Sequence, residues 1–323
     1  MSVLVTGGSG YLGQFVVQEL AKSSKVGFTY CQADPPHFNG DAQGFKVDLV
    51  SGEGLAEAFS SLGEVALVVN CAAISQPGVC EKDPEAARAV NVPSRLLDLL
   101  GEQRRGTGRE AALVHVSTDQ VYDGGRALWT EADACEPVNA YGSSKLEAER
   151  EIALRWPRSA ILRSSIIYGP PPPAQPVRRA LFLQFMVDSL GRGERTQFFE
   201  DEFRSPVYVK DILRAIRAAA DSLLAAATPE GSGARVYNMG GPARMSRVDM
   251  ARSVASACGL DASCIVPCSA ASVDRGAKSP ADISMDSSLL ERELGITTTP
   301  FEAALLDKGM PGSEHLPTSR ATQ

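Results

Sequence analysis

Residues that build metal sites and disulfide frameworks are scarce in this sequence. Its 323 residues include three histidines and seven cysteines, an odd number, and no two cysteines form a Cys-x-x-Cys pair. Cys264 and Cys268 lie closest together, but no second pair completes a zinc site with them. We therefore expect no metal centre and no structural disulfide. Reduced thiols are typical of a reducing compartment, which favours the cytoplasm.

Positive charge and long apolar runs are also in short supply. Lysine and arginine number 32 against 39 aspartates and glutamates, which gives a formal net charge of -7 at pH 7. A general nucleic-acid surface needs a basic patch, so nucleic acid is not an expected partner. No apolar run approaches the roughly 20 residues of a membrane span, and strand-like sequence begins at Ser2, so neither a membrane anchor nor a secretory signal is expected. A small molecule or another protein remains.

Strand-like and helix-like patterns alternate through the first half of the chain. Several strand-like runs are apolar throughout, as expected of strands that are covered on both faces. Strands that alternate with longer helices favour an α/β fold, in which a doubly wound parallel sheet carries helices on both sides. The expected strands are Val3–Thr6, Val26–Tyr30, Phe45–Val47, Val65–Asn70, Ala112–Ser117 and Ala160–Arg163, and the expected helices are Gly13–Lys22, Leu55–Ser60, Pro84–Leu100 and Ala140–Leu154.

The pattern changes after the proline run Pro170–Pro173, beyond which strand-like pieces such as Val236–Met239 become rarer. We predict a first unit over residues 1–170 and a smaller α/β lobe over residues 171–308, interleaved with the edge of the sheet. Residues 309–323 are rich in Pro, Ser, Thr and Gly and are predicted to form a disordered tail. The helices expected in the lobe are Arg179–Gly191, Lys210–Ala226 and Arg247–Ala257.

A glycine-rich turn joins the first strand to the first helix. Gly7 and Gly10 allow the backbone to approach a pyrophosphate closely, and Gly13 lets the helix pack against the strand. The helix N-terminus then offers unpaired N–H groups and the positive end of its dipole to the phosphates. Glycine spacing alone is also compatible with a simple tight turn. A strand before the turn and a helix after it favour an NAD(P)-binding loop of the Rossmann type.

The end of the second strand usually selects between NAD(H) and NADP(H). An acidic residue there binds the ribose hydroxyls, whereas a basic residue accepts a 2′-phosphate. This chain has Thr29-Tyr30-Cys31-Gln32, which contains neither. Since no carboxylate repels a 2′-phosphate, the sequence favours NADP(H) and leaves NAD(H) open.

Tyr141 and Lys145 stand four residues apart on an expected helix, so both side chains share one face. A phenol has a pKa of about 10, and a nearby lysine ammonium would favour its ionised form and bring its pKa toward the working range. Lys145 could also bind the nicotinamide ribose. Such a pair is often a plain surface pair, but Thr118 lies at the carboxyl end of the preceding strand, where ligands of open α/β sheets bind. Thr118 would hydrogen-bond a substrate carbonyl that Tyr141 protonates.

These residues together make the chain resemble the extended short-chain dehydrogenase/reductases. Within that superfamily it is most similar to the dTDP-4-dehydrorhamnose reductases, with their RmlD-like substrate binding, and to the regulatory β subunits of methionine adenosyltransferase. The resemblance covers about residues 1–307. It rests on Thr6–Gly13, Asp48-Leu49, Asn70–Ala73, Asn91, Ser117–Tyr122, Tyr141 with Lys145, Leu162–Pro170, Phe203–Asp211 and Asn238–Gly241.

The resemblance implies a role for each matching position. Thr118, Tyr141 and Lys145 would be catalytic. Ser117 and Arg204, together with Thr118, would contact the substrate. The implied cofactor-binding residues are Thr6, Gly7, Gly10, Tyr11, Leu12, Gly13, Asp48, Leu49, Cys71, Ala72, Ala73, Asn91, Tyr141, Lys145 and Ser164.

Two of these positions have a plain structural alternative. Arg204 could instead form a salt bridge with Glu202 or Asp211. Asn91 could instead hold the helix bend before Pro93.

Two functions follow from the resemblance. The first is an NAD(P)H-dependent reductase of the keto group of a 4-keto-6-deoxy nucleotide sugar, with a homodimer as an open option. The second is an NADP-binding regulatory subunit that partners the catalytic subunit of a methionine adenosyltransferase. The intact Thr–Tyr–Lys set favours the enzyme. One departure concerns the substrate: Ser279 precedes Pro280 where rhamnose reductases often carry an arginine, and Arg275 and Lys278 are the candidates to replace it.

Overall fold

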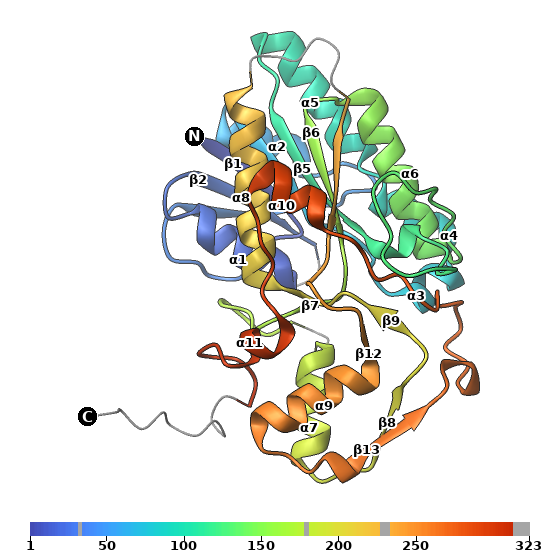
Figure 1. Ribbon diagram of the computed structural model, residues 1–323. Helices are drawn as coiled ribbons and strands as arrows, with labels where there is room; N and C mark the ends of the chain where they lie inside the picture. Colours follow the sequence, from blue (N-terminus) through green and yellow to red (C-terminus); the bar gives the residue numbers. More distant parts are fainter. Residues whose placement is uncertain (32–33, 178–180, 227–232, 313–323) are drawn as a thin grey trace.

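A computed structural model describes residues 1–31, 34–177, 181–226 and 233–312 of the chain (Figure 1). Its centre is a seven-stranded sheet in the order β11-β6-β5-β4-β1-β2-β3, in which every neighbouring pair is parallel. The predicted α/β fold with a doubly wound parallel sheet is therefore confirmed. The strands of this sheet are β1 (Ser2–Thr6), β2 (Lys25–Tyr30), β3 (Ala42–Lys46), β4 (Val65–Asn70), β5 (Ala112–Thr118), β6 (Ser159–Ser164) and β11 (Arg235–Met239).

Apolar side chains leave β1 alternately toward the two faces of the sheet. The helices that cover these faces are α1 (Tyr11–Leu20), α2 (Leu55–Leu62), α5 (Ser94–Thr107), α6 (Ala140–Arg155) and α8 (Val209–Ala225). Val3 and Val5 pack in one core with residues of α1 and α8, whereas Leu4 packs in a second core with residues of α2, α5 and α6. Because strand side chains alternate, one buried strand serves both layers.

The single helix predicted over residues 84–100 is wrong. The chain instead forms α4 (Pro84–Asn91) and then α5, with Pro93 between them. Proline has no N–H to donate within a helix, so the first ladder of hydrogen bonds stops before it. A short helix that no pattern predicted, α3 (Pro77–Lys82), also precedes α4. Six residues are too few to show a helical period in the sequence.

The second half of the chain completes the sheet and also builds the smaller lobe. Its elements are β7 (Ile167–Tyr168), α7 (Phe182–Gly191), β8 (Thr196–Phe199), β9 (Phe203–Arg204), β10 (Val207–Tyr208), β12 (Met245–Ser246), α9 (Arg247–Cys258), β13 (Ile265–Cys268), α10 (Ser288–Leu294) and α11 (Phe301–Leu305). Helix α8 and strand β11 belong to the sheet layers, whereas α7 and α9 pack together with β8 and β13 at the lower end of Figure 1. The lobe is thus assembled from segments that flank α8 and β11 in the chain.

The disordered tail was predicted over residues 309–323, but its first four residues are folded. Met310 is 1% exposed and belongs to the main core, and a Cβ on Gly312 would lie 2.5 Å from the sulfur of Cys258. Residues 309–312 are therefore part of the folded structure. Residues 313–323 lie outside the described ranges, as do Gln32 at the end of the second strand and Arg179 at the start of a predicted helix.

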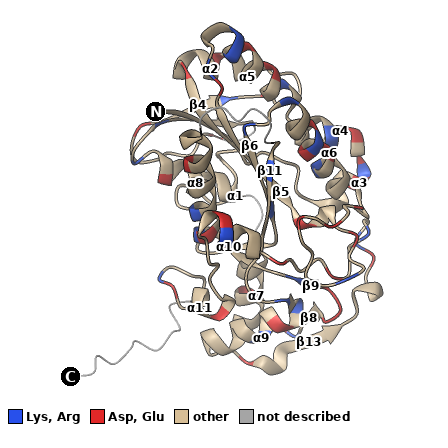
Figure 2. Ribbon diagram, turned by 45° about the horizontal axis from the view of Figure 1, so that its top comes forward, with Lys and Arg blue, Asp and Glu red and all other residues tan. Residues whose placement is uncertain are grey.

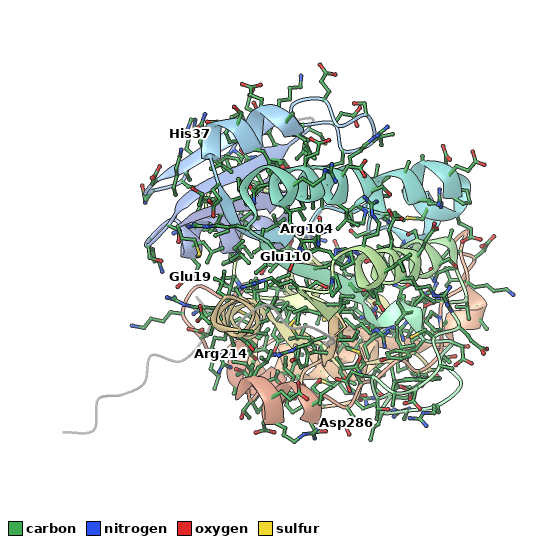
Figure 3. All side chains as sticks on the ribbon, turned by 90° about the horizontal axis from the view of Figure 1, so that it is seen from above. Glu19, His37, Arg104, Glu110, Arg214 and Asp286 are labelled. Carbon is green, nitrogen blue, oxygen red and sulfur yellow. The ribbon has the colours of Figure 1, made fainter. Side chains whose placement is uncertain are left out.

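Charges of both signs are mixed on the outer helices, as the blue and red segments of α4 and α6 show (Figure 2). Arg104 and Glu110, labelled in Figure 3, pair at 3.2 Å across the turn between α5 and β5. Within the described ranges, no helix combines the length and the apolar character that a membrane crossing requires.

Candidate functional site

The glycine turn after β1 has the geometry of a phosphate-binding loop. Gly7 has a φ of +67°, and a Cβ there would lie 2.8 Å from the Cα of Ala72, so only glycine fits. A Cβ on Gly13 would lie 2.1 Å from the carbonyl oxygen of Gly7, which shows how closely α1 approaches the turn. Gly10 differs from both: it is exposed, and the nearest protein atom to its Cβ would be that same oxygen, at 3.2 Å. Apart from this one tight contact, no described protein atom beyond the neighbouring residues lies within 4 Å of that Cβ, so the space beside Gly10 is otherwise open.

The N-terminus of α1 opens onto this room. Gly10 is the N-cap and has no side chain to bond the first N–H groups of the helix. Such groups, together with the helix dipole, attract an anion. Tyr11 and Leu12, two predicted cofactor contacts, have protein partners instead: the Tyr11 hydroxyl donates to the carbonyl of Pro170 at 2.9 Å, and Leu12 is buried in the core. At this end of α1, backbone N–H groups rather than these two side chains are therefore the groups available to a ligand.

Gln14 fastens the proline-rich segment beside the first turn of α1. Its side chain is fully buried. Its Nε2 donates to the carbonyls of Ser9 and Gln175 at 3.1 and 3.0 Å. Its Oε1 accepts from the N–H groups of Ala174 and Gln175 at 3.1 and 2.9 Å. The segment that begins at Pro170 is therefore fixed next to the glycine turn, a feature that the sequence patterns did not reveal.

The loop that follows β4 lies against the glycine turn. Strand β1 sits between β2 and β4, so this is the point where chain connections leave in opposite directions and where ligands of such sheets bind. The N–H of Cys71 donates to the carbonyl of Thr6 at 3.2 Å, and the N–H of Ala72 donates to the Thr6 hydroxyl at 3.4 Å. Cys71, Ala72 and Ala73 are all partly exposed, as the lining of a groove requires. Burial raises the pKa of the Cys71 thiol to about 12, so that thiol stays neutral.

Asn91 holds this loop in place. Its Oδ1 accepts from the N–H of Ile74 at 2.7 Å, and its Nδ2 donates to the Ile74 carbonyl at 3.1 Å and to the Ser144 hydroxyl at 2.9 Å. The side chain is fully buried. Its geometry therefore supports neither a direct cofactor contact nor a role at the bend before Pro93: it ties the loop to α6.

The remaining predicted cofactor positions lie at the same carboxyl edge of the sheet. Asp48 follows β3, and its Oδ1 accepts from the N–H of Val50 at 2.8 Å, so its carboxylate shapes the turn. Leu49 is partly exposed. Ser164 ends β6, is buried and donates to the carbonyl of Ser165 at 3.0 Å. The parallel sheet brings these positions to one edge, although several of their side chains bond within the protein.

Thr118 and Tyr141 meet at this edge from different elements. Thr118 ends β5, and Tyr141 lies in the first turn of α6, whose N-cap Asn139 accepts from the N–H of Gly142 at 2.9 Å. Burial raises the pKa of Tyr141 well above its usual value, and the hydrogen bond with Thr118 opposes this only in part. A phenol that keeps its proton is suited to donate it.

Lys145 does not act on Tyr141 as the sequence predicts. Its Nζ donates to the carbonyl of Val116 at 2.7 Å and lies 3.0 Å from Nε2 of His115. The neighbours that shift the pKa of Tyr141 do not include Lys145. The prediction that the Lys145 ammonium favours the ionised phenol is therefore wrong, because the lysine side chain turns inward to β5.

A buried ion pair lies behind Lys145. Nη2 of Arg163 is 2.7 Å from Oε2 of Glu149, and both side chains are almost fully buried. The Ser117 hydroxyl also donates to Glu149, so the predicted substrate contact of Ser117 is directed into the protein. Burial lowers the pKa of Lys145 to about 8, although Glu149 and Cys71 favour its ammonium.

Arg204 comes from β9 and is 3% exposed. Its guanidinium donates to its neighbour's backbone carbonyl at 2.7 Å and to the Ser279 hydroxyl at 3.1 Å, and Glu202 lies 3.8 Å away. Asp211, the other expected partner, pairs with Arg214 at 2.6 Å. Ser279, which precedes Pro280, is thus an acceptor for Arg204.

Arg247, which the sequence analysis did not single out, adds a second guanidinium. It begins α9 and lies over the ring of Phe182, 4.5 Å from the ring centre. Burial, followed by repulsion from Arg204, lowers the pKa of Arg247 to about 9. Arg275, one candidate to replace the missing arginine, is paired with Glu202. Two neighbouring cations that repel each other, one buried and one half-buried, suit an anionic ligand.

The thiols show no sign of a metal centre in the part of the chain that the structure describes. No three His, Cys, Asp or Glu side chains gather there in a way that could hold an ion. Cys264 is buried, Cys268 is partly exposed, and neither forms a disulfide.

Comparison with known proteins extends over almost the whole chain. The family described as "RmlD substrate binding domain" matches residues 1–308. Methionine adenosyltransferase 2 subunit beta of Danio rerio is 28% identical over 312 residues, which cover 96% of this chain and 90% of the relative. The "Probable low-salt glycan biosynthesis reductase Agl14" of Haloferax volcanii is 29% identical over 305 residues, with 94% and 95% covered. The solved structure of dTDP-4-dehydrorhamnose reductase from Bacillus anthracis in complex with NADP has a TM-score of 0.76 at 20% identity, with 94% and 96% covered.

Proposed function

Because the chain belongs to the RmlD substrate binding domain family, we propose that it is an NAD(P)-dependent enzyme that reduces the keto group of a 4-keto-6-deoxy nucleotide sugar. The observation that carries this proposal is the meeting of Thr118 and Tyr141 at the carboxyl edge of the sheet, which also holds the glycine turn. A dinucleotide bound at the glycine turn and the proton donor Tyr141 would then lie on either side of the substrate carbonyl.

The residues fit a dinucleotide. The room beside Gly10 and the uncapped start of α1 receive the phosphates. At the end of β2 the Thr29 hydroxyl accepts from the N–H of Gly7 at 3.0 Å, and Tyr30 and Cys31 bring no carboxylate. A 2′-phosphate meets no repulsion there, so NADP(H) is the favoured cofactor and NAD(H) the alternative. The relative from Bacillus anthracis that holds NADP supports the same choice.

Side chains of the protein bind the substrate and the cofactor and donate the proton that the carbonyl oxygen takes up. When bound, the reduced nicotinamide supplies the hydride for the carbonyl carbon. Tyr141 donates its phenolic proton to the substrate oxygen, and Thr118 orients that oxygen by a hydrogen bond. Lys145 offers an N–H to the ribose. In the lobe, Arg204 and Arg247 hold the anionic nucleotide part of the substrate.

A substrate panel tests this proposal. The purified protein is mixed with NADPH and a set of 4-keto-6-deoxy nucleotide sugars, and NADPH oxidation is followed by absorbance. We expect oxidation with at least one member of the panel and none with the matching 4-hydroxy sugars. Tight NADPH binding without turnover of any keto sugar would contradict the enzymatic role.

The cofactor site has its own test. Gly10→Val fills the room kept beside the turn, so calorimetric titration should detect no NADPH binding while the melting temperature stays near that of the wild type. Gly106→Val is the matched control, because a Cβ there meets nothing within 4 Å. That variant should bind NADPH normally, and unchanged affinity in Gly10→Val would refute the assignment of the turn.

A regulatory role is the second candidate, supported by the similarity to methionine adenosyltransferase 2 subunit beta. In that role the chain binds NADP(H), reduces no keto sugar and controls a partner. Gel filtration with a methionine adenosyltransferase catalytic subunit tests it, and the same column reports whether the chain alone is a homodimer. Co-elution that survives Tyr141→Phe would favour the regulator, whereas separate elution would exclude this partner.

A further inference from the structure

Residues 275–281 form an irregular stretch, the bridging segment, between the lobe and the carboxyl edge of the sheet. The chain enters it after β13, where it runs from the lobe toward α3 (Figure 1). A Cβ on Gly78 of α3 would lie 3.1 Å from the carbonyl oxygen of Arg275. At the other end, the N–H of Phe203 in β9 donates to the carbonyl of Ala281 at 2.7 Å. The bridging segment therefore contacts α3 at its start and β9 at its end.

Arg204 holds the end of the bridging segment that meets β9. Its guanidinium donates to the Ser279 hydroxyl at 3.1 Å and to the Ala281 carbonyl at 3.4 Å. Just beyond, the N–H of Ile283 donates to the carbonyl of Phe203 at 3.2 Å. The place of the Arg204 side chain and the place of the bridging segment therefore depend on each other.

Asn139 holds the middle of the bridging segment from the opposite side. This side chain is 4% exposed and caps α6, where its Oδ1 accepts from the N–H of Gly142 at 2.9 Å. Its Nδ2 donates to the carbonyl of Lys278 at 3.0 Å and to Oε1 of Gln120 at 2.9 Å. Lys278 lies three residues before Ala281, so a short stretch of chain links the cap of α6 to β9.

Backbone groups fix the orientation of the Asn139 amide. The N–H of Gly142 can only donate, and the carbonyl of Lys278 can only accept. The amide oxygen must therefore face α6, and the amide nitrogen must face the bridging segment. Both contacts have the usual length of an N–H···O bond.

The helix cap alone does not require asparagine at position 139. Aspartate, serine and asparagine are similarly good N-caps, because each supplies an oxygen to the first N–H groups of a helix. Of these three side chains, only asparagine also supplies an N–H group that can donate to a carbonyl. The bonds to Lys278 and Gln120 therefore account for the choice of asparagine.

We propose that Asn139 is a positioning residue for the substrate: by binding Lys278 it holds the bridging segment, and with it Arg204, at a fixed distance from the turn of α6 that carries Tyr141. The proposal rests on the proposed function, because one nucleotide sugar must meet Tyr141 with its keto group and Arg204 with its nucleotide part. Two ends of a site that are spaced before binding do not have to be ordered by the ligand, and this favours affinity.

Trypsin cleavage after Lys278, an exposed residue, measures how firmly the bridging segment is held. Cleavage needs a locally opened chain and follows the population of that opened form. Asn139→Asp keeps the cap and the side-chain size but turns an oxygen toward the Lys278 carbonyl, and Asn139→Ser keeps the cap with a shorter side chain. We expect cleavage after Lys278 to be about 5- to 100-fold faster in both variants, as when a buried carbonyl loses its donor. Cleavage after Lys308, an exposed residue beyond α11, is the internal reference and should not change.

Steady-state kinetics then separates positioning from a general loss of structure. Both variants keep the cap of the turn that carries Tyr141, so kcat should stay within about twofold of the wild type, while KM for the keto sugar should rise about 10-fold. The dissociation constant of NADPH should not change. Asp83→Asn is the matched control, because Asp83 caps α4 at the surface and accepts from the N–H of Ala86 at 3.0 Å. Neither the cleavage rate nor KM should change in that variant.

Equal cleavage after Lys278 in the wild type and in both variants would overturn the proposal. A lower kcat with an unchanged KM would also overturn it, because Asn139 would then act through the cap of α6 alone. A wild type that reduces no keto sugar would contradict the proposed function instead. In that case calorimetric titration with dTDP and UDP replaces KM: weaker binding in the two Asn139 variants supports the positioning role, whereas unchanged binding, or no binding to the wild type, refutes it.

Discussion

Arg163 is buried and Arg247 is half-buried, and the surroundings of their guanidiniums differ sharply. Arg163 forms a two-pronged pair with Glu149, with Nε and Nη2 at 3.1 and 2.7 Å from Oε2. Burial lowers the pKa of both arginines, but Glu149 more than reverses this for Arg163, whereas Arg204 lowers the pKa of Arg247 further. Arg247 has no carboxylate within ion-pair distance among the described residues. A buried cation paired with a carboxylate inside the protein stabilises the structure, whereas a cation with no carboxylate at ion-pair distance is available to an anionic ligand.

The same contrast separates the surroundings of α6 from the lobe. Around α6, Lys145 donates to the Val116 carbonyl and contacts His115, and Arg163 pairs with Glu149, so both cations have polar partners in the protein before any ligand arrives. In the lobe, burial and Arg204 oppose the charge of Arg247, and the carboxylates of Glu202 and Asp119 offset this only in part, so a bound anion would stabilise it. Substitutions near α6 should therefore change turnover or stability, and substitutions in the lobe should change substrate affinity.

Tyr141→Phe should give the largest effect. It removes the proton donor but keeps the buried ring, and general acid–base catalysis typically contributes 10²–10⁴-fold. We expect kcat for the keto sugar to fall by about that factor, while the NADPH dissociation constant changes only a few-fold. Steady-state kinetics and calorimetry measure the two quantities. Undiminished turnover in this variant would remove Tyr141 from the chemistry.

Glu149→Gln should destabilise the fold by about 3–5 kcal/mol, because it leaves Arg163 buried and unbalanced. Urea unfolding of the wild type and the variant gives this difference. Glu147→Gln is the matched control, since Glu147 lies on the same helix but pairs with Arg88 at the surface. No measurable change is expected there. Equal losses of unfolding free energy in the two variants would show that the buried ion pair is no more important for stability than the exposed one.

Arg247→Leu should raise KM for the nucleotide sugar by roughly 10- to 100-fold, the value of a charged hydrogen bond or two, with kcat and NADPH affinity little changed. The cationic form binds the anion, and its pKa is about 9, so wild-type substrate affinity should be full below pH 9 and fall as the pH rises through it. That decline should be absent in Arg247→Leu. The measurement uses saturating NADPH, and Arg252→Leu, an exposed change on the same helix, is the control. A lower kcat with an unchanged KM would show that Arg247 contributes to turnover, like the residues around α6, and not to substrate affinity.

The glycine turn could be predicted from the sequence because its determinants are local. Gly7, Gly10 and Gly13 lie within one turn and the start of one helix, where Gly7 has a positive φ and Gly13 lets α1 approach the turn. His115 and Arg247 could not be found in this way. His115 contacts Lys145, thirty residues away, and Asn70, forty-five residues away, and the order of the strands in the sheet brings these residues together.

Two signals in the sequence could have improved the prediction of the site. Ser117 and Thr118 are neighbours on one strand and therefore point to opposite faces, so only one of them can reach a shared substrate. Thr118 meets Tyr141, and Ser117 meets Glu149. Glu149 also continues the four-residue spacing of Tyr141 and Lys145, which places it on the same face of α6.

Gln14 bears on the association rate of the proposed dinucleotide. Its four hydrogen bonds fix the segment up to Gln175 beside the start of α1. Ordering a residue costs about 1–2 kcal/mol of conformational entropy, and here that loss belongs to folding rather than to binding. The segment up to Gln175 therefore does not have to become ordered when a dinucleotide binds, which removes one cause of slow association. Residence time, rather than the association rate, then distinguishes a tightly held cofactor from a weakly held one.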